Sequence, residues 1–179
     1  LMLFVAFVAW VVFLWFYLSQ PALASSDPVD IQVDAVRLEA HVRKLSEEFI
    51  PRAAFSLGGT KRTADYIRDE LDAATGASGR AEDLWFQAMG KKHRNVSLVL
   101  GEGIDRSRIV VGAHYDAYLE YPGADDNATG VAGVIELARL IAPLEGELTR
   151  PVEFVCYPLE EPPYFGSEEM GSAYHARGL

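Results

Sequence analysis

The first 18 residues of the chain are almost all apolar and include no charged residue. As a helix, this run would extend about 27 Å, close to the ~30 Å hydrocarbon core of a bilayer. A small-x-small sequence, Ala22-Leu23-Ala24, follows and is typical of a signal-peptidase site. We therefore predict a membrane anchor or signal-peptide core at residues 1–18, a linker at residues 19–33, and export of the remainder to the periplasm or the extracellular space.

Two amphipathic helices are predicted after this segment. Apolar residues recur with helical spacing between residues 34 and 49, and Pro51 ends the pattern. Thr60 can cap a second helix that continues to about Ala74, where glycines follow. These helices begin a globular domain that we expect to occupy residues 34–179.

Strands and helices then alternate. Residues 81–88 and 95–100 have strand character and predict a hairpin, with MGKKHR between them. Residues 108–116 and 151–158 are continuous apolar runs, typical of strands buried on both faces, and residues 130–142 between them have helical periodicity. A strand–helix–strand order implies a parallel pair. We therefore predict an α/β fold with three αβα layers and a mixed, largely parallel central sheet.

Polar side chains gather where the predicted strands end. His114 and Asp116 end one strand, Glu160 and Glu161 follow the other, and Asp126 lies in the acidic turn between them. Ligands bind outside the carboxyl ends of strands in open α/β sheets. Each group alone is typical of a structural role, but neighbouring carboxylates repel each other unless a cation lies beside them. Imidazole and carboxylate are ligands of catalytic zinc.

Three motifs in this order resemble the bacterial branch of the M28 family of zinc peptidases, the co-catalytic aminopeptidases. They are GAHYD, PGADDNATGVAGVIELARL and FVCYPLEEPPYFGSEEMGS, and the resemblance extends over about residues 36–179. It implies a zinc-exopeptidase-like fold, a peptide substrate and two zinc ions per complete site.

The resemblance also implies a role for each residue. His114 would bind one zinc ion, and Asp116 would orient its imidazole ring. Asp126 would bridge the two ions and be followed by a cis peptide bond, and Glu161 would bind the second ion. Glu160 would be the general base that takes a proton from the attacking water.

The family pattern has two further ligands, an Asp and a His, that lie downstream of the residues present here. His175 is the only later histidine, and we expect it to be structural. His41 and His93 are predicted to be surface residues. We therefore expect a domain that is incomplete at its C-terminus, with little activity alone.

Composition narrows the possibilities further. The net charge is −10, from 26 acidic and 16 basic residues. The sequence has no cluster of basic residues that could bind phosphates, so we expect no nucleic-acid partner. Cys156 is the only cysteine, which excludes an intramolecular disulfide, and its apolar neighbours indicate a buried side chain. Two alternatives stay open: a single-zinc acyltransferase similar to glutaminyl cyclase, and a non-catalytic ectodomain with a peptidase fold.

Overall fold

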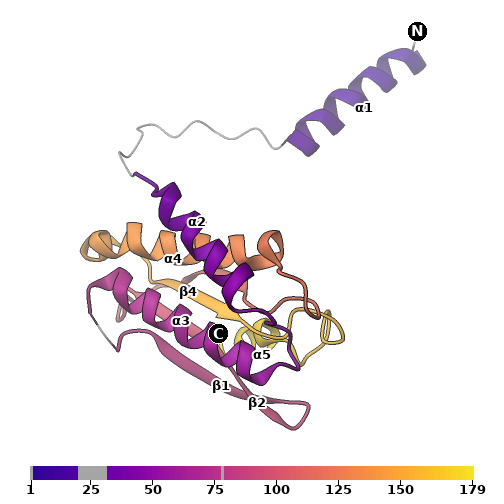
Figure 1. Ribbon diagram of the computed structural model, residues 1–179. Coiled ribbons are helices and arrows are strands. Elements are labelled where there is room, and N and C mark those ends of the chain that lie inside the picture. Colours follow the sequence, from indigo (N-terminus) through magenta and orange to yellow (C-terminus); the bar gives the residue numbers. More distant parts are fainter. Residues whose placement is uncertain (1, 20–31, 78) are drawn as a thin grey trace. The chain divides into compact units, whose positions relative to one another are not determined.

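The computed structural model describes residues 2–19, 32–77 and 79–179 (Figure 1). The chain divides into two units, residues 1–31 and residues 32–179. In the first unit, α1 (Met2–Ser19) exposes most of its described apolar side chains. Across the described ranges, we find no helix that has both the length and the apolar character needed to cross a membrane. The predicted anchor therefore stays a prediction, and most of the predicted linker lies outside the described residues.

The second unit is built on a mixed sheet of four strands in the order β1-β2-β4-β3. β1 (Glu82–Ala88) and β2 (Lys91–Leu100) form an antiparallel hairpin, and β2 also pairs antiparallel with β4 (Val152–Tyr157). β3 (Ile109–His114) is parallel to β4, as the strand–helix–strand order predicts. The mixed sheet is confirmed, but it is less parallel than predicted because β2 is antiparallel to both of its neighbours.

The β1–β2 hairpin closes more tightly than its sequence suggested. Met89 and Gly90 are the two turn residues, and both have positive φ, 48° and 72°. Such values are typical of a type I′ turn, whose twist matches that of paired strands. The strands therefore continue through most of the polar connection that separates the two apolar runs.

Three helices cover one face of the sheet: α2 (Ala35–Arg43), α3 (Leu57–Thr75) and α4 (Thr129–Ile141) (Figure 1). Between these helices and the strands lies the main apolar core. Its large, fully buried side chains are Leu45, Ile67, Leu71, Val96, Leu98, Leu100, Val131, Ile135 and Phe154. Burial of apolar surface contributes roughly 25 cal/mol per Å². Burial of this core therefore holds the helices against the sheet.

The opposite face of the sheet carries α5 (Gly171–Ala176). Because alternate strand residues point to opposite faces, Glu153 and Tyr157 point away from the core that Phe154 joins. In α5, His175 places Nε2 3.1 Å from a Glu153 carboxylate oxygen and Nδ1 3.0 Å from the Tyr157 hydroxyl. Helices thus lie on both faces, and the predicted αβα arrangement is confirmed.

The two central apolar runs differ in burial. β4 is buried along almost its whole length, as predicted. β3 is not, since Ile109 and Val110 are 50% and 37% exposed. The prediction that this strand is buried on both faces is wrong, because β3 pairs on one side only, at the edge of the described sheet.

The second helix begins earlier than predicted. α3 starts at Leu57, so Thr60 lies inside its first turn and does not cap it. The Thr60 hydroxyl instead donates to the Ser56 carbonyl, 3.2 Å away. At the other end, Gly76 has a left-handed φ of 67° and terminates the helix, as its sequence position indicates.

Two of the three histidines outside the predicted site are buried where we expected surface residues. His41 is 5% exposed and hydrogen-bonds to the Tyr66 hydroxyl at 2.6 Å, and His93 is 5% exposed beside Phe86. Burial lowers the pKa of both rings. The prediction failed because the aromatic partners of both rings, Tyr66 and Phe86, come from other parts of the sequence. His175 is also buried, in contact with Glu153 and Tyr157, and its structural role stays a prediction.

Candidate metal centre

The predicted site residues are brought together at one edge of the sheet. β3 and β4 are parallel, and His114, the last residue of β3, is in register with Tyr157, the last residue of β4. Glu160 and Glu161 follow immediately after β4. Between the two strands, the turn η2 (Ala124–Ala128) carries Asp126 to the same edge before α4 begins. Strand pairing therefore assembles the group that the sequence predicted.

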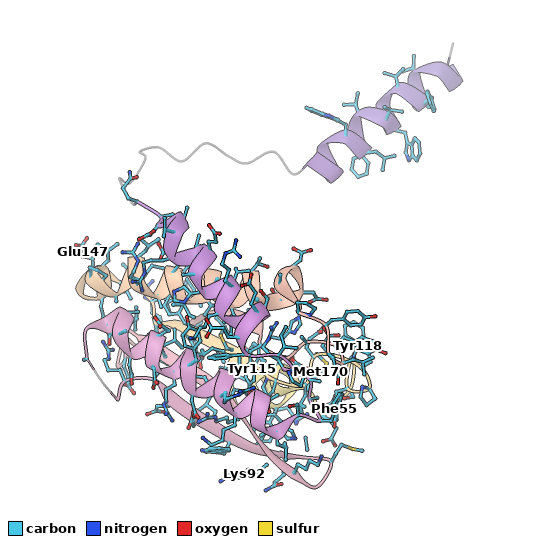
Figure 2. All side chains as sticks on the ribbon, in the orientation of Figure 1. Phe55, Lys92, Tyr115, Tyr118, Glu147 and Met170 are labelled. Carbon is cyan, nitrogen blue, oxygen red and sulfur yellow. The ribbon has the colours of Figure 1, made fainter. Side chains whose placement is uncertain are left out.

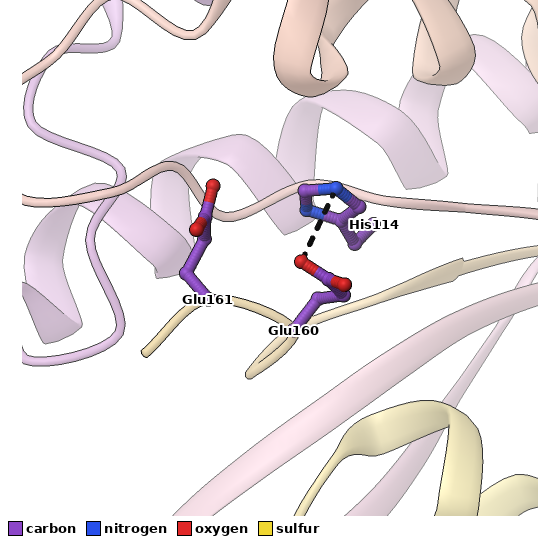
Figure 3. Close-up of side chains that lie close together, drawn as sticks. All are labelled: His114, Glu160 and Glu161. Carbon is purple, nitrogen blue, oxygen red and sulfur yellow. Dashed lines mark ion pairs between the residues drawn. The ribbon is translucent and has the colours of Figure 1, made fainter. Parts of the chain in front are cut away.

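The imidazole ring of His114 is surrounded by carboxylates. Its Nε2 atom lies 2.9 Å from Asp126 Oδ1. The same nitrogen lies 3.6 Å from Glu160 Oε2, the ion pair that is drawn in Figure 3. On the other side of the ring, Nδ1 lies 3.5 Å from Asp116 Oδ1. Nδ1 is buried, and no described residue gives it a well-formed hydrogen bond. The ring thus presents Nε2 to the open side of the site and Nδ1 to a buried carboxylate.

Asp116 has a second task that the sequence did not indicate. Its side chain is fully buried, and its two oxygens accept the backbone N–H groups of Glu160, at 3.2 Å, and Glu161, at 3.1 Å. One carboxylate therefore faces the His114 ring and also fixes the chain that carries both glutamates. Only the fold reveals this, because the partners are 44 and 45 residues apart in the sequence.

Three side chains are close enough to share one cation. His114, Glu160 and Glu161 each offer a ligand atom, and these atoms lie within 4.8 Å of one another (Figure 3). This group includes Glu160, which the family pattern assigns as the base, and leaves out Asp126, which it assigns as the bridging ligand. Asp126 instead contacts the ring nitrogen of His114 and is 74% exposed. Imidazole and carboxylate donors fit zinc.

Electrostatics in this cluster favour a positive charge. Burial lowers the pKa of His114, but the carboxylates of Asp116, Glu160 and Asp126 outweigh that effect and raise the pKa to about 9. Burial also raises the pKa of Glu161, as do the neighbouring negative charges of Asp126 and Asp116. Without a cation, the His114 proton thus partly offsets the repulsion among the acids. A bound metal ion would replace that proton, because imidazole binds metal in its neutral form.

The turn that carries Asp126 is tightly constrained. Gly123 precedes it with a left-handed φ of 56°, and the Asp126–Asn127 peptide bond is cis, as predicted. The Asn127 side chain accepts the backbone N–H of Gly130 at 2.9 Å, so it caps the start of α4. The acidic turn is thereby joined directly to a long buried helix.

Arg52 is a residue of this region that sequence reasoning missed. It lies in the loop after η1 (Lys44–Glu48), and it is only 1% exposed. Within the described part of the chain, its guanidinium group donates to four backbone carbonyls, those of Leu45, Tyr115, Pro122 and Gly123. An arginine in a loop is ordinarily exposed, so the sequence carries no signal for this role.

A family comparison agrees with this geometry. The model for peptidase family M28 matches residues 95–177, a segment that contains every residue of the predicted site. Residues 95–177 belong to peptidase family M28. The M28 segment includes the edge of the sheet described above, from β2 to α5.

Relatives extend this similarity over most of the chain. An uncharacterized protein, YfbL, from Escherichia coli K12 is 40% identical over 154 residues, which are 80% of this chain and 45% of that protein. Leucine aminopeptidase 1 from Metarhizium robertsii is 26% identical over 155 residues, 79% of this chain and 38% of that protein. The chain therefore spans less than half the length of these two relatives.

Solved structures share the fold. LapB from Legionella pneumophila has a TM-score of 0.68 and 27% identity, over 82% of this chain and 39% of LapB. A Bacteroides thetaiotaomicron glutaminyl cyclase has a TM-score of 0.65 and 20% identity, over 82% of this chain and 56% of the cyclase. The second likeness concerns the fold alone.

Proposed function

We propose that this chain supplies part of the active site of a zinc-dependent exopeptidase that is similar to aminopeptidases. The observation that carries the proposal is the cluster at the carboxyl edge of β3 and β4, where His114 faces Asp126 and both glutamates. Membership of a peptidase family supports hydrolysis of peptide bonds as the reaction. The residues fit zinc, because they are an imidazole and carboxylates held at one place.

Each side chain has a specific part in this proposal. His114, Asp126 and Glu161 hold zinc. Asp116 keeps the His114 ring and the backbone of Glu160 and Glu161 in place. Zinc, when bound, would polarise the peptide carbonyl and acidify a water molecule. Glu160 takes the proton of the attacking water and passes it to the leaving amine. The family resemblance implies two zinc ions in the complete site.

A variant pair tests the assignment of the two glutamates. In a protein that extends over the full length of its relatives, Glu160→Gln should abolish hydrolysis of an aminoacyl chromogenic amide while zinc content stays close to wild type. Glu161→Gln should lose zinc as well as activity. Glu147→Gln is the control, since Glu147 is exposed and far from the site. Tyr118, which lies in the loop after Asp116, marks the site end of this unit, and Glu147 lies at the opposite end (Figure 2). Zinc loss in Glu160→Gln would show that the two roles are misassigned.

A single-zinc cyclase is the alternative that the fold permits, since a glutaminyl cyclase has the same architecture. Peptidase chemistry is favoured because the M28 peptidase model matches the segment and leucine aminopeptidases are among its relatives. Metal analysis of the full-length protein separates the two: two zinc ions per chain favour the peptidase, and one favours the cyclase. A non-catalytic domain would contain no stoichiometric zinc.

We also propose that the domain is exported, on the basis of the apolar run at residues 1–18. Fusion of residues 1–33 to a phosphatase that is active only outside the cytoplasm should give active phosphatase. Activity no higher than that of the phosphatase without the fusion would argue against export.

A further inference from the structure

Arg52 is a buried charge that no described carboxylate binds directly. A buried charge is costly unless it is paired or fully hydrogen-bonded. Arg52 is 1% exposed, and Nε and both Nη atoms donate to carbonyl oxygens at distances between 2.5 and 3.1 Å. Burial lowers the pKa of the guanidinium group, while the negative charge of Asp116 raises it. The negative charge of Asp116 therefore partly compensates this buried positive charge.

The carbonyls that Arg52 binds lie at both ends of one loop. Tyr115 stands between His114 and Asp116, at the end of β3. Pro122 and Gly123 lie directly before the turn that carries Asp126. The Arg52 backbone adds a further contact, since its carbonyl accepts the N–H of Ala117 at 3.3 Å. One side chain thus bridges the start and the end of the loop that separates two groups of predicted metal ligands.

The contact between Arg52 and Leu45 ties this loop to the rest of the domain. Leu45 belongs to η1, it is fully buried, and its carbonyl accepts an Nη1 donor of Arg52. The loop is therefore held from the side of the helical layer as well as by the strand. Four hydrogen bonds from one planar guanidinium group reach these carbonyls, and lysine cannot reproduce that arrangement.

We infer that Arg52 is a positioning residue of the metal centre. It fixes the separation between His114 and Asp126 before a cation binds, and its positive charge offsets part of the repulsion among the carboxylates. Arg52 lies behind the backbone of the loop and does not act as a ligand. This inference rests on the proposed zinc site, and it assigns a function to a residue outside the matched segment 95–177.

Zinc affinity of the full 179-residue chain tests the inference without any need for catalysis. Wild type and variants are titrated with zinc against a competing chelator, and His114→Ala identifies the zinc that is bound at this site. Arg52→Met and Arg52→Lys should each bind zinc about 10–100-fold more weakly than wild type, the range for loss of residues that orient metal ligands. Arg94→Met is the matched control, because Arg94 is also buried, yet it pairs with Asp65 and Asp83.

The outcomes separate positioning from general stability. Urea unfolding should show that Arg94→Met is destabilised, while its zinc affinity equals that of wild type. Wild-type affinity in either folded Arg52 variant, or an equal loss in Arg94→Met, would overturn the inference. So would a failure of the charge-conserving Arg52→Lys to fold, because Arg52 would then be a folding residue. If wild type and His114→Ala bind zinc equally, the proposed metal centre itself fails.

Discussion

Gly123 occupies the tightest point of the turn that delivers Asp126, and Gly123→Ala tests that geometry. A Cβ atom at this position would lie 2.5 Å from the Asp126 carbonyl oxygen, 2.8 Å from Ala117 Cβ and 2.9 Å from Arg52 Nη2. Carbon and oxygen atoms in contact are normally more than 3 Å apart, so the backbone of the turn must move. The residue also has φ of 56°, a left-handed conformation that favours glycine.

These two effects can be separated by a second glycine. Gly76 has φ of 67° at the end of α3, but a Cβ atom there would meet nothing within 4 Å. Gly76→Ala therefore reports the left-handed conformation alone, which costs about 1–2 kcal/mol for a residue with a side chain. Gly123→Ala should carry that cost and a further 1–3 kcal/mol or so for overpacking.

Urea unfolding measures the difference between these variants. We expect the free energy of unfolding of Gly123→Ala to be lower than that of Gly76→Ala by about 1–3 kcal/mol, the overpacking contribution. Zinc affinity should fall in Gly123→Ala only, since only this substitution displaces the backbone of Asp126. Equal stability in the two variants would refute the argument from crowding, and equal zinc affinity would refute the link between the turn and the metal centre.

Three further predictions concern the core, pH and metal. Phe154→Ala, at a fully buried position of β4, should lower the free energy of unfolding by about 3–5 kcal/mol in urea titrations. Hydrogen bonds from Arg139 depress the pKa of Glu136 to about 2, so its contribution to stability is present above pH 4.5 and lost towards pH 2. Acid titrations of Glu136→Gln should show a shallower loss than wild type over that interval. Zinc at 100 times its Kd should stabilise wild type by about 2.7 kcal/mol, with no effect in His114→Ala or after addition of a chelator.

The elements of the second unit were largely predictable, because their signals are local. Apolar spacing located α3 and α4, and the strand–helix–strand order gave the parallel β3–β4 pair. The position of a strand within the sheet was not predictable in the same way. β3 and β4 have similar apolar runs, yet only β4 has neighbours on both sides. Burial of a strand depends on pairing partners that are distant in the sequence, and apolar content alone does not specify them.

In the candidate site, too, features with a local sequence signal were predictable and contacts between distant residues were not. Residues at strand ends could be predicted because parallel strands end at one edge, and this placed His114 near Glu160 and Glu161. The contacts that orient these residues could not be predicted, since Arg52 and its partner Gly123 are 71 residues apart in the sequence. The surface position expected for His41 failed for a similar reason, because its partner Tyr66 lies on another helix.

Two buried groups of opposite charge hold the chain segments that carry the proposed metal ligands. Asp116 accepts the backbone N–H groups of Glu160 and Glu161, which follow β4. Arg52 binds the backbone at both ends of the loop after β3. Neither group needs to touch a cation, since each fixes the chain that presents the ligands. If this division of roles is correct, zinc affinity should depend on both residues together: the double variant Asp116→Asn/Arg52→Lys should deviate from the sum of the single effects. Strict additivity would mean that the two loops are positioned independently.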